Sequence, residues 1–270
     1  MERILLIGGD GLIGTAFNNH LTAHKFDFYK TTRREKNSGN QLFFDLNDKI
    51  SKFRFPENIK KAYILVGMNG IANCEEKPEL AKHLNVDQTI NLIRHLNENQ
   101  IHAVFFSSSE VFNGEKKNVL PEEAKNPRSH YGLCKALVVD FIIENSSNAP
   151  IVRCGKVFQE LPILKKWRSE ISNGVSPSIL RNKFISPITP NELVNQLLNN
   201  EKRKHSLVNQ ISGAEDLSYI QIFKHYFNGH EKIFRSDLIQ PTANLKYESL
   251  SYSGMFEDVS PISSWKSIQS

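Results

Sequence analysis

The sequence of 270 residues contains 39% hydrophobic and 23% charged residues, which is typical of a soluble globular protein with a substantial core. Its net charge of +5 comes from short basic runs separated by apolar segments, and this dispersion argues against a nucleic-acid-binding face. The apolar stretches are far too short to cross a bilayer, so we expect no membrane partner either.

The cysteines and the N-terminal segment predict the cellular compartment of the protein. Cys74, Cys134 and Cys154 are odd in number and far apart, which argues against a disulfide framework. The first apolar run ends after Ile7 and lacks the length and the cleavage site of a signal peptide. We therefore expect a cytoplasmic protein. The nine histidines show no metal-ligand spacing, so we expect no metal site.

Strand-like and helix-like segments alternate through the first half of the chain. The predicted strands are short, continuous apolar runs, and the helices between them carry apolar residues at helical spacing. In chain order, the sequence predicts strands at 3–7, 27–31, 41–44, 62–66, 103–107 and 151–154, with helices at 11–21, 78–100 and 129–144.

This alternation predicts an α/β fold with a doubly wound parallel sheet of the Rossmann type, covered by helices on both faces. Ligands of such sheets bind at the carboxyl ends of the strands. After residue 155, prolines at 162, 177, 187 and 190 interrupt the pattern. We expect a Rossmann-like domain over 1–155 and a smaller, mainly substrate-binding lobe over 156–270, from which strands can return to the first domain.

A glycine-rich turn follows the first predicted strand in the stretch ILLIGGDGLIG, with Gly8, Gly11 and Gly14 at intervals of three. A strand, a glycine turn and a helix form the context of dinucleotide binding, because bare backbone N–H groups and a helix N-terminus can face a pyrophosphate. The spacing is G-x-x-G-x-x-G rather than G-x-G-x-x-G. A turn that binds no ligand is the alternative explanation of the glycines alone.

A second feature is the pair Tyr131 and Lys135 in YGLCK. Residues four apart share one face of a helix, so the phenol and the ammonium can address the same ligand. A free tyrosine has a pKa near 10, and a nearby cation lowers it toward neutral pH, where the phenol becomes a useful acid or base. A surface pair without function is the alternative.

Together these motifs resemble the extended short-chain dehydrogenase/reductase superfamily, whose signatures are G-x-x-G-x-x-G at the first turn and Y-x-x-x-K on a later helix. Within it, the chain is most similar to dTDP-4-dehydrorhamnose reductases and related sugar-nucleotide reductases. The stretch SSSEVFNG (107–114) resembles their STDYVFDG, and NKFISPITPNEL (182–193) resembles their DQFGSPTYVGDL. The motif SSW, ending at Trp265, matches their C-terminal tryptophan, so the resemblance covers nearly the whole chain.

The resemblance implies roles for individual residues. Tyr131 would be the general acid, giving a proton to a carbonyl oxygen as hydride reaches the carbon. Lys135 would bind the nicotinamide ribose and lower the pKa of the tyrosine, and Ser108 would hold the substrate oxygen. Asn85 matches a helix asparagine of the family with a structural or water-relay role.

The second predicted strand bears on the choice of cofactor. It runs into Arg33 and Arg34, and Asp27 stands at its beginning, so no acid ends it. Arginine accommodates a 2′-phosphate, whereas an acid binds a free ribose 2′-hydroxyl, so we expect NADP(H). The resemblance places Asp45 at the adenine. The full set of expected cofactor-binding residues is Gly8, Gly11, Leu12, Ile13, Gly14, Arg33, Arg34, Asp45, Val66, Gly67, Tyr131 and Lys135.

Three departures from the family's pattern concern the substrate. Ser108 and Ser109 replace its Thr and Asp, which removes a carboxylate, and Glu110 replaces an aromatic residue. MNGIANCEE (68–76) replaces the usual run of small residues. Related dehydratases and decarboxylases carry a catalytic glutamate where Glu110 stands.

The resemblance implies a reductase of a nucleoside-diphosphate 4-keto-6-deoxy sugar in surface polysaccharide precursor synthesis. The expected substrate residues are Ser109, Glu110, Arg181 and Lys183, with Lys165, Lys166 and Arg168 as further candidates for the diphosphate. A sugar-nucleotide epimerase, dehydratase or decarboxylase is one alternative, and a regulatory NADP-binding protein without activity is another. The sequence is compatible with a homodimer.

Overall fold

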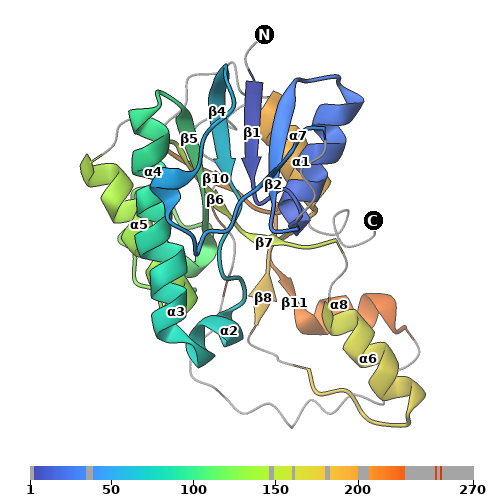
Figure 1. The fold of residues 1–270 in the computed structure, drawn as a ribbon. Helices are drawn as coiled ribbons and strands as arrows, with labels where there is room; N and C mark the ends of the chain where they lie inside the picture. The colour runs from blue at the N-terminus through green and yellow to red at the C-terminus, as the bar shows by residue number, and fades with distance from the viewer. Residues whose placement is uncertain are drawn as a thin grey trace.

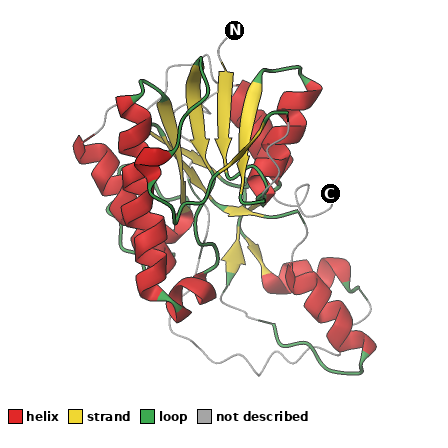
Figure 2. Ribbon diagram, in the orientation of Figure 1, coloured by secondary structure: helices red, strands yellow, loops and turns green. Residues whose placement is uncertain are grey.

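A seven-stranded sheet lies at the centre of the molecule, with helices on both faces and a smaller lobe below the ends of the strands (Figures 1 and 2). The structure is a computed structural model that describes residues 3–34, 39–145, 149–159, 162–179, 183–199, 207–228, 247 and 250.

The strand order of the central sheet is β10-β6-β5-β4-β1-β2-β3, and each neighbouring pair is parallel. The predicted doubly wound parallel sheet is therefore confirmed. The order reverses between β1 and β4, the switch point where such sheets bind ligands. The strands are β1 Arg3–Ile7, β2 Phe28–Thr32, β3 Gln41–Phe43, β4 Ile59–Ile64, β5 His102–Ser108, β6 Ile151–Cys154 and β10 Val208–Ile211.

The apolar side chains of β1 pack in two hydrophobic cores, one on each face of the sheet, because successive side chains of a strand point to opposite faces. Leu5 and Ile7 belong to the core under α4 (Thr89–Glu98) and α5 (His130–Asn145). Ile4 and Leu6 belong to the opposite core, under α1 (Leu12–Ala23) and α7 (Pro190–Asn199). Both faces of β1 are thus covered from Ile4 to Ile7, which explains why the strand reads as a hydrophobic segment without alternation.

The segment predicted as one helix over 78–100 is instead built from several pieces. The helices α3 (Pro78–Lys82) and α4 flank a π-helical turn, η2 (His83–Gln88), and a further short helix, α2 (Ile71–Glu76), precedes them. Hydrophobic spacing does not reveal such a turn, because it adds a residue within a continuous helical path. The turn carries Asn85, which contacts the loop after β4.

Two elements from the second half of the chain join the sheet layers. Strand β10 pairs with β6, and α7 packs beside α1, where the His20 ring and the Asn195 side-chain oxygen lie 2.8 Å apart. The sequence predicted that strands from the second half of the chain can return to the first domain. The domain boundary at residue 155 stays a proposal.

The smaller lobe has its own apolar cluster. Trp167 is fully buried there, with its ring centre 5.3 Å from that of Phe223. The two-stranded pairs β7–β9 and β8–β11 connect the lobe to the sheet domain. The elements of this region are β7 Lys156–Val157, α6 Pro162–Ser172, β8 Phe184–Ile185, β9 Pro187–Ile188, β11 Leu217–Ser218 and α8 Tyr219–Tyr226. The sheet domain also has short 3-10 helices, η1 at Ile50–Lys52 and η3 at Ser109–Val111.

All three cysteines are buried and form no disulfide. Within the described ranges, no helix has the length and apolarity needed to span a membrane. The same part of the chain holds no cluster of three or more His, Cys, Asp or Glu side chains suited to a metal ion.

Candidate functional site

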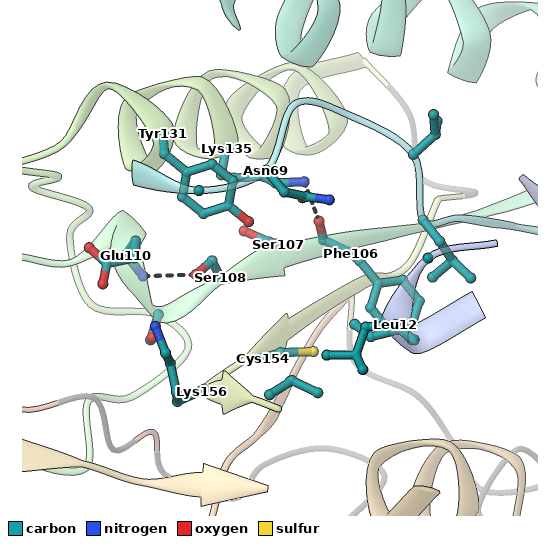
Figure 3. Close-up of a pocket in the computed structure, with 18 of the residues that line it drawn as sticks. Leu12, Asn69, Phe106, Ser107, Ser108, Glu110, Tyr131, Lys135, Cys154 and Lys156 are labelled. Carbon is teal, nitrogen blue, oxygen red and sulfur yellow. Dashed lines mark hydrogen bonds between the residues drawn. The ribbon is translucent and has the colours of Figure 1, made fainter. Parts of the chain in front are cut away.

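A cavity of about 390 Å³ lies at the carboxyl ends of the central strands, between the sheet and the first residues of the lobe (Figure 3). It brings together the glycine turn, the end of β5 and the start of α5. Its lining residues are Gly11, Leu12, Ile13, Gly14, Ile64, Leu65, Val66, Asn69, Gly70, Ile71, Phe106, Ser107, Ser108, Ser109, Glu110, Tyr131, Lys135, Cys154, Gly155, Lys156 and Val157.

The glycine turn needs its first and last glycines for different reasons. Gly8 has a φ of +96°, a conformation that side chains strongly disfavour. A Cβ on Gly14 would lie 2.4 Å from the carbonyl oxygen of Gly8, so only glycine lets α1 begin this close to β1. No side chain caps the N-terminus of α1, which leaves its first N–H groups facing the cavity for an anionic group.

Tyr131 and Lys135 both enter the cavity from the first turns of α5 (Figure 3). The Lys135 ammonium is buried, donates a hydrogen bond to the Phe106 carbonyl at 2.9 Å and lies 4.8 Å from the centre of the Phe105 ring. Burial lowers the pKa of Lys135 to about 8, although the nearby thiols of Cys154, Cys134 and Cys74 act in the opposite direction.

The expected lowering of the Tyr131 pKa is wrong for this structure. Burial raises it above the ordinary value, and the neighbouring thiols of Cys154 and Cys74 and the Glu110 carboxylate add to that rise. Hydrogen bonding with Ser108 acts in the opposite direction. The Lys135 ammonium is directed at a backbone carbonyl and stays 5.8 Å from the centre of the tyrosine ring. Tyr131 is therefore a neutral phenol with a proton to donate.

Two serines at the end of β5 lie beside the Tyr131 hydroxyl (Figure 3). The Ser108 hydroxyl accepts a hydrogen bond from the Glu110 N–H at 3.2 Å, which fixes its position at the start of η3. The Ser107 hydroxyl is buried in the cavity wall without a hydrogen-bond partner. Sequence reasoning missed Ser107, although the run of three serines was a visible signal.

The outer part of the cavity carries three polar side chains from separate segments. Glu110 comes from η3, Lys156 from β7 and Asn69 from the loop before α2 (Figure 3). Glu110 and Ser109 were expected at the substrate. Lys156 and Asn69 were not expected, because no motif signals which residues of the lobe and of the 68–76 run reach the cavity.

The loop after β4 is held by Asn85. Its side-chain oxygen accepts from the Met68 N–H at 2.7 Å, and its amide donates to the Met68 carbonyl at 2.9 Å. A Cβ on Gly67 would lie 2.7 Å from the same oxygen. Val66 lines the cavity as expected, whereas Gly67 lies just outside it, against Asn85. These bonds give Asn85 a structural role in shaping the cavity wall.

The end of β2 is more acidic than the sequence suggested. Arg33 and Arg34 follow the strand and are exposed. The Thr32 hydroxyl at the end of the strand donates a hydrogen bond to the carboxylate of Asp10, which comes from the glycine turn. An acid therefore does stand at this corner. The sequence around β2 does not show this acid, because Asp10 belongs to the glycine turn, a different segment of the chain.

Asp45 follows β3 and does not line the main cavity. Its carboxylate accepts from the Asn47 N–H at 2.9 Å and faces a second cavity of about 390 Å³ beside β3. That cavity is lined by Phe43, Phe44, Asp45, Asp48, Lys49, Ile50, Lys52 and Phe53.

Those basic residues predicted for the diphosphate that the structure describes do not line the main cavity. The Lys183 ammonium lies 5.6 Å from the centre of the Tyr219 ring, and Lys166 pairs with Glu170 on α6 at 3.6 Å. Lys165 and Arg168 lie on the same helix and do not line the cavity either. Arg181 and Trp265 lie outside the described residues.

Comparisons with known proteins agree with this architecture. The family model described as "RmlD substrate binding domain" matches residues 1–204. Among curated proteins, none matches the sequence.

Several solved structures are similar. A hypothetical dTDP-4-dehydrorhamnose reductase from Sulfolobus tokodaii has 22% identity and a TM-score of 0.79, over 96% of this chain and 95% of that one. A dTDP-4-dehydrorhamnose reductase from Bacillus anthracis in complex with NADP has 16% identity and a TM-score of 0.78, over 99% and 96%. TunA, an NAD-dependent NDP-hexosamine 5,6-dehydratase, has 16% identity and a TM-score of 0.78, over 100% and 96%.

At these identities, the structural matches establish the fold. The family model covers about three quarters of the sequence, from the glycine turn to α7, and so includes every lining residue of the main cavity. The chain therefore belongs to the RmlD substrate binding domain family, within the extended short-chain dehydrogenase/reductases.

Proposed function

We propose that this protein is a reductase that uses NADPH to reduce the keto group of a nucleoside-diphosphate 4-keto-6-deoxy sugar. The observation that carries the proposal is the placement of the Tyr131 phenol beside Ser108, in a cavity that continues to the glycine turn. A neutral phenol next to a second hydroxyl is suited to protonating a carbonyl oxygen.

The residues fit a nicotinamide dinucleotide. The close approach at Gly14 and the uncapped start of α1 form a cradle for the pyrophosphate. The unpartnered Ser107 hydroxyl and the Lys135 ammonium lie deeper in the same cavity, where a nicotinamide riboside can be held. Arg33 and Arg34 support NADPH over NADH through their charge at the end of β2. When bound, the cofactor supplies a hydride.

The protein's own groups then account for the remaining chemistry. The Ser108 hydroxyl, fixed by the Glu110 N–H, orients the carbonyl oxygen of the sugar. The Tyr131 hydroxyl gives its proton to that oxygen as the carbonyl carbon accepts the hydride, so the keto group becomes a secondary alcohol. The buried Lys135 ammonium stabilises the phenolate that remains on Tyr131.

Glu110 supports a second candidate function, because its carboxylate lines the cavity close enough to Tyr131 to raise the pKa of the phenol. A carboxylate at this place can remove a proton from the sugar, which a dehydratase requires and a simple reductase does not. The similarity to TunA accords with this alternative, and an epimerase or decarboxylase would use the same wall.

The experiment incubates the protein with NADPH or NADP and a panel of nucleotide sugars, and follows NADPH absorbance together with product mass. Stoichiometric loss of NADPH with a gain of two hydrogens in the sugar is expected. Loss of water or carbon dioxide without net use of NADPH would contradict the reductase. Cofactor binding without turnover of any sugar would favour a regulatory NADP-binding protein.

The proposed reaction belongs in the cytoplasm, where NADPH and nucleotide sugars meet, and its product would be a 6-deoxyhexose nucleotide for surface polysaccharide. The three buried, unbridged cysteines accord with a reducing compartment.

A further inference from the structure

We propose that Asp10 sets how strongly this protein discriminates between NADPH and NADH. The inference rests on the proposed binding of a nicotinamide dinucleotide and adds a residue that opposes Arg33 and Arg34. The acid that binds a ribose 2′-hydroxyl in Rossmann folds ordinarily ends the second strand. Here the carboxylate reaches the same corner from the glycine turn.

Hydrogen bonds fix the position of Asp10. The Thr32 hydroxyl at the end of β2 donates to the Asp10 carboxylate. One step back along the strand, the Thr31 hydroxyl accepts from the Gly8 N–H at 2.9 Å, and the Thr31 carbonyl accepts from the Gly9 N–H at 3.1 Å. The turn is thus joined to the strand by the two residues that precede Asp10 and by the Asp10 side chain itself, which keeps the carboxylate at the strand end.

The two arginines lie at the same corner. The Arg34 N–H donates to the Thr32 hydroxyl at 3.1 Å, so one hydroxyl connects the segment that carries the arginines with the carboxylate of Asp10. Asp10, Arg33 and Arg34 are all exposed. A ribose placed here meets charges of both signs.

The charge of Asp10 and the charges of the two arginines have opposite effects on the relative affinities for NADPH and NADH. A carboxylate accepts a hydrogen bond from the free 2′-hydroxyl of NADH and repels the doubly charged 2′-phosphate of NADPH. The guanidinium groups attract that phosphate. Asp10 therefore narrows the preference for NADPH that the arginines create, and a protein with both features can bind either cofactor.

The test is the substitution Asp10→Asn in the full chain, with the affinities for NADPH and NADH measured from the fluorescence of the reduced nicotinamide. Asparagine keeps an oxygen that can accept from Thr32 but loses the charge. The ratio of NADPH to NADH affinity is expected to rise about fivefold or more at low salt. The rise should shrink in about 0.5 M salt, because screening weakens exposed charge pairs.

The matched control is Asp27→Asn, which removes the same charge just before the other end of β2, where Asp27 pairs with Arg3. It should leave the affinity ratio within about twofold of the native value. The thermal midpoint of each variant, measured without cofactor, checks that the glycine turn remains folded.

The outcomes separate the two proposals. An unchanged ratio in a folded Asp10→Asn protein that binds both cofactors would overturn the role of Asp10 and leave the reductase standing. A fall in the ratio of NADPH to NADH affinity would also overturn the role of Asp10. If the native protein bound neither cofactor, the proposed function itself would fail.

Discussion

Lys135 joins α5 to β5 through a hydrogen bond of 2.9 Å from its ammonium to the carbonyl oxygen of Phe106. The bond lies inside the core and directly under the wall formed by Ser107 and Ser108. A single side chain therefore affects both the stability of the sheet domain and the chemistry of the cavity, and these two effects can be measured separately.

Replacing Tyr131 by Phe removes the proton donor and keeps the ring. We expect turnover to fall by about two orders of magnitude or more, the usual effect of losing a general acid, while cofactor affinity changes little. NADPH consumption and cofactor titration measure the two quantities. Tyr29→Phe, on β2 away from the cavity, is the control that should keep full activity. Near-normal reduction by the Tyr131 variant would remove this residue from the mechanism.

Lys135→Met tests the buried ammonium through the pH dependence of stability. The pKa of Lys135 falls from 10.5 to about 8 on folding, so between these values the unfolded chain holds a proton that the folded chain has released. The free energy of unfolding of the native protein should therefore rise with pH across this window, relative to the variant, by up to about 3 kcal/mol.

Denaturant unfolding at about pH 7, 9 and 10.5 measures this difference for the native protein and the variant. Lys52→Met is the control for the loss of an exposed lysine. A constant difference between the native protein and Lys135→Met across the range would contradict the burial of a titrating ammonium. Lys135→Ala should also weaken both cofactor binding and rate.

Gly14→Ala places a methyl group 2.4 Å from the Gly8 carbonyl oxygen, which belongs to the backbone and cannot turn away. We expect a loss of about 1–3 kcal/mol in the free energy of unfolding and a clear loss of cofactor affinity, because the turn must move. In Gly11→Ala the nearest contact of the new methyl is 3.5 Å, so its thermal midpoint should stay close to the native one. Equal midpoints for the two variants would show that the turn is not tightly packed.

Replacing Arg33 and Arg34 together by Ala tests the source of NADPH preference. A charge-assisted bond to a phosphate contributes roughly 1.5–3 kcal/mol, so NADPH affinity should fall about ten- to a hundredfold while NADH affinity stays nearly unchanged. Titration of both cofactors measures this. Parallel losses for NADPH and NADH would mean that the arginines do not act on the 2′-phosphate.

Local patterns in the chain determined the sheet and the centre of the site. Runs such as 3–7, 103–107 and 151–154 are mostly apolar because both faces of a parallel sheet are covered, and they formed β1, β5 and β6 nearly as predicted. Tyr131 and Lys135 are four residues apart on one helix, so their common face follows from helical geometry alone.

Only the tertiary structure decided which distant segments meet. It brought Asp10 to the end of β2, Lys156 and Asn69 into the cavity, and β10 to the edge of the sheet. It also turned Lys183 to Tyr219 and directed the Lys135 ammonium at Phe106. Burial of Tyr131 raises its pKa, where the sequence predicted a lower one. The periodicity of apolar residues in the sequence indicates whether a residue is buried within its own helix or strand. Contacts between elements, and the desolvation that governs a pKa, depend on packing across the whole chain.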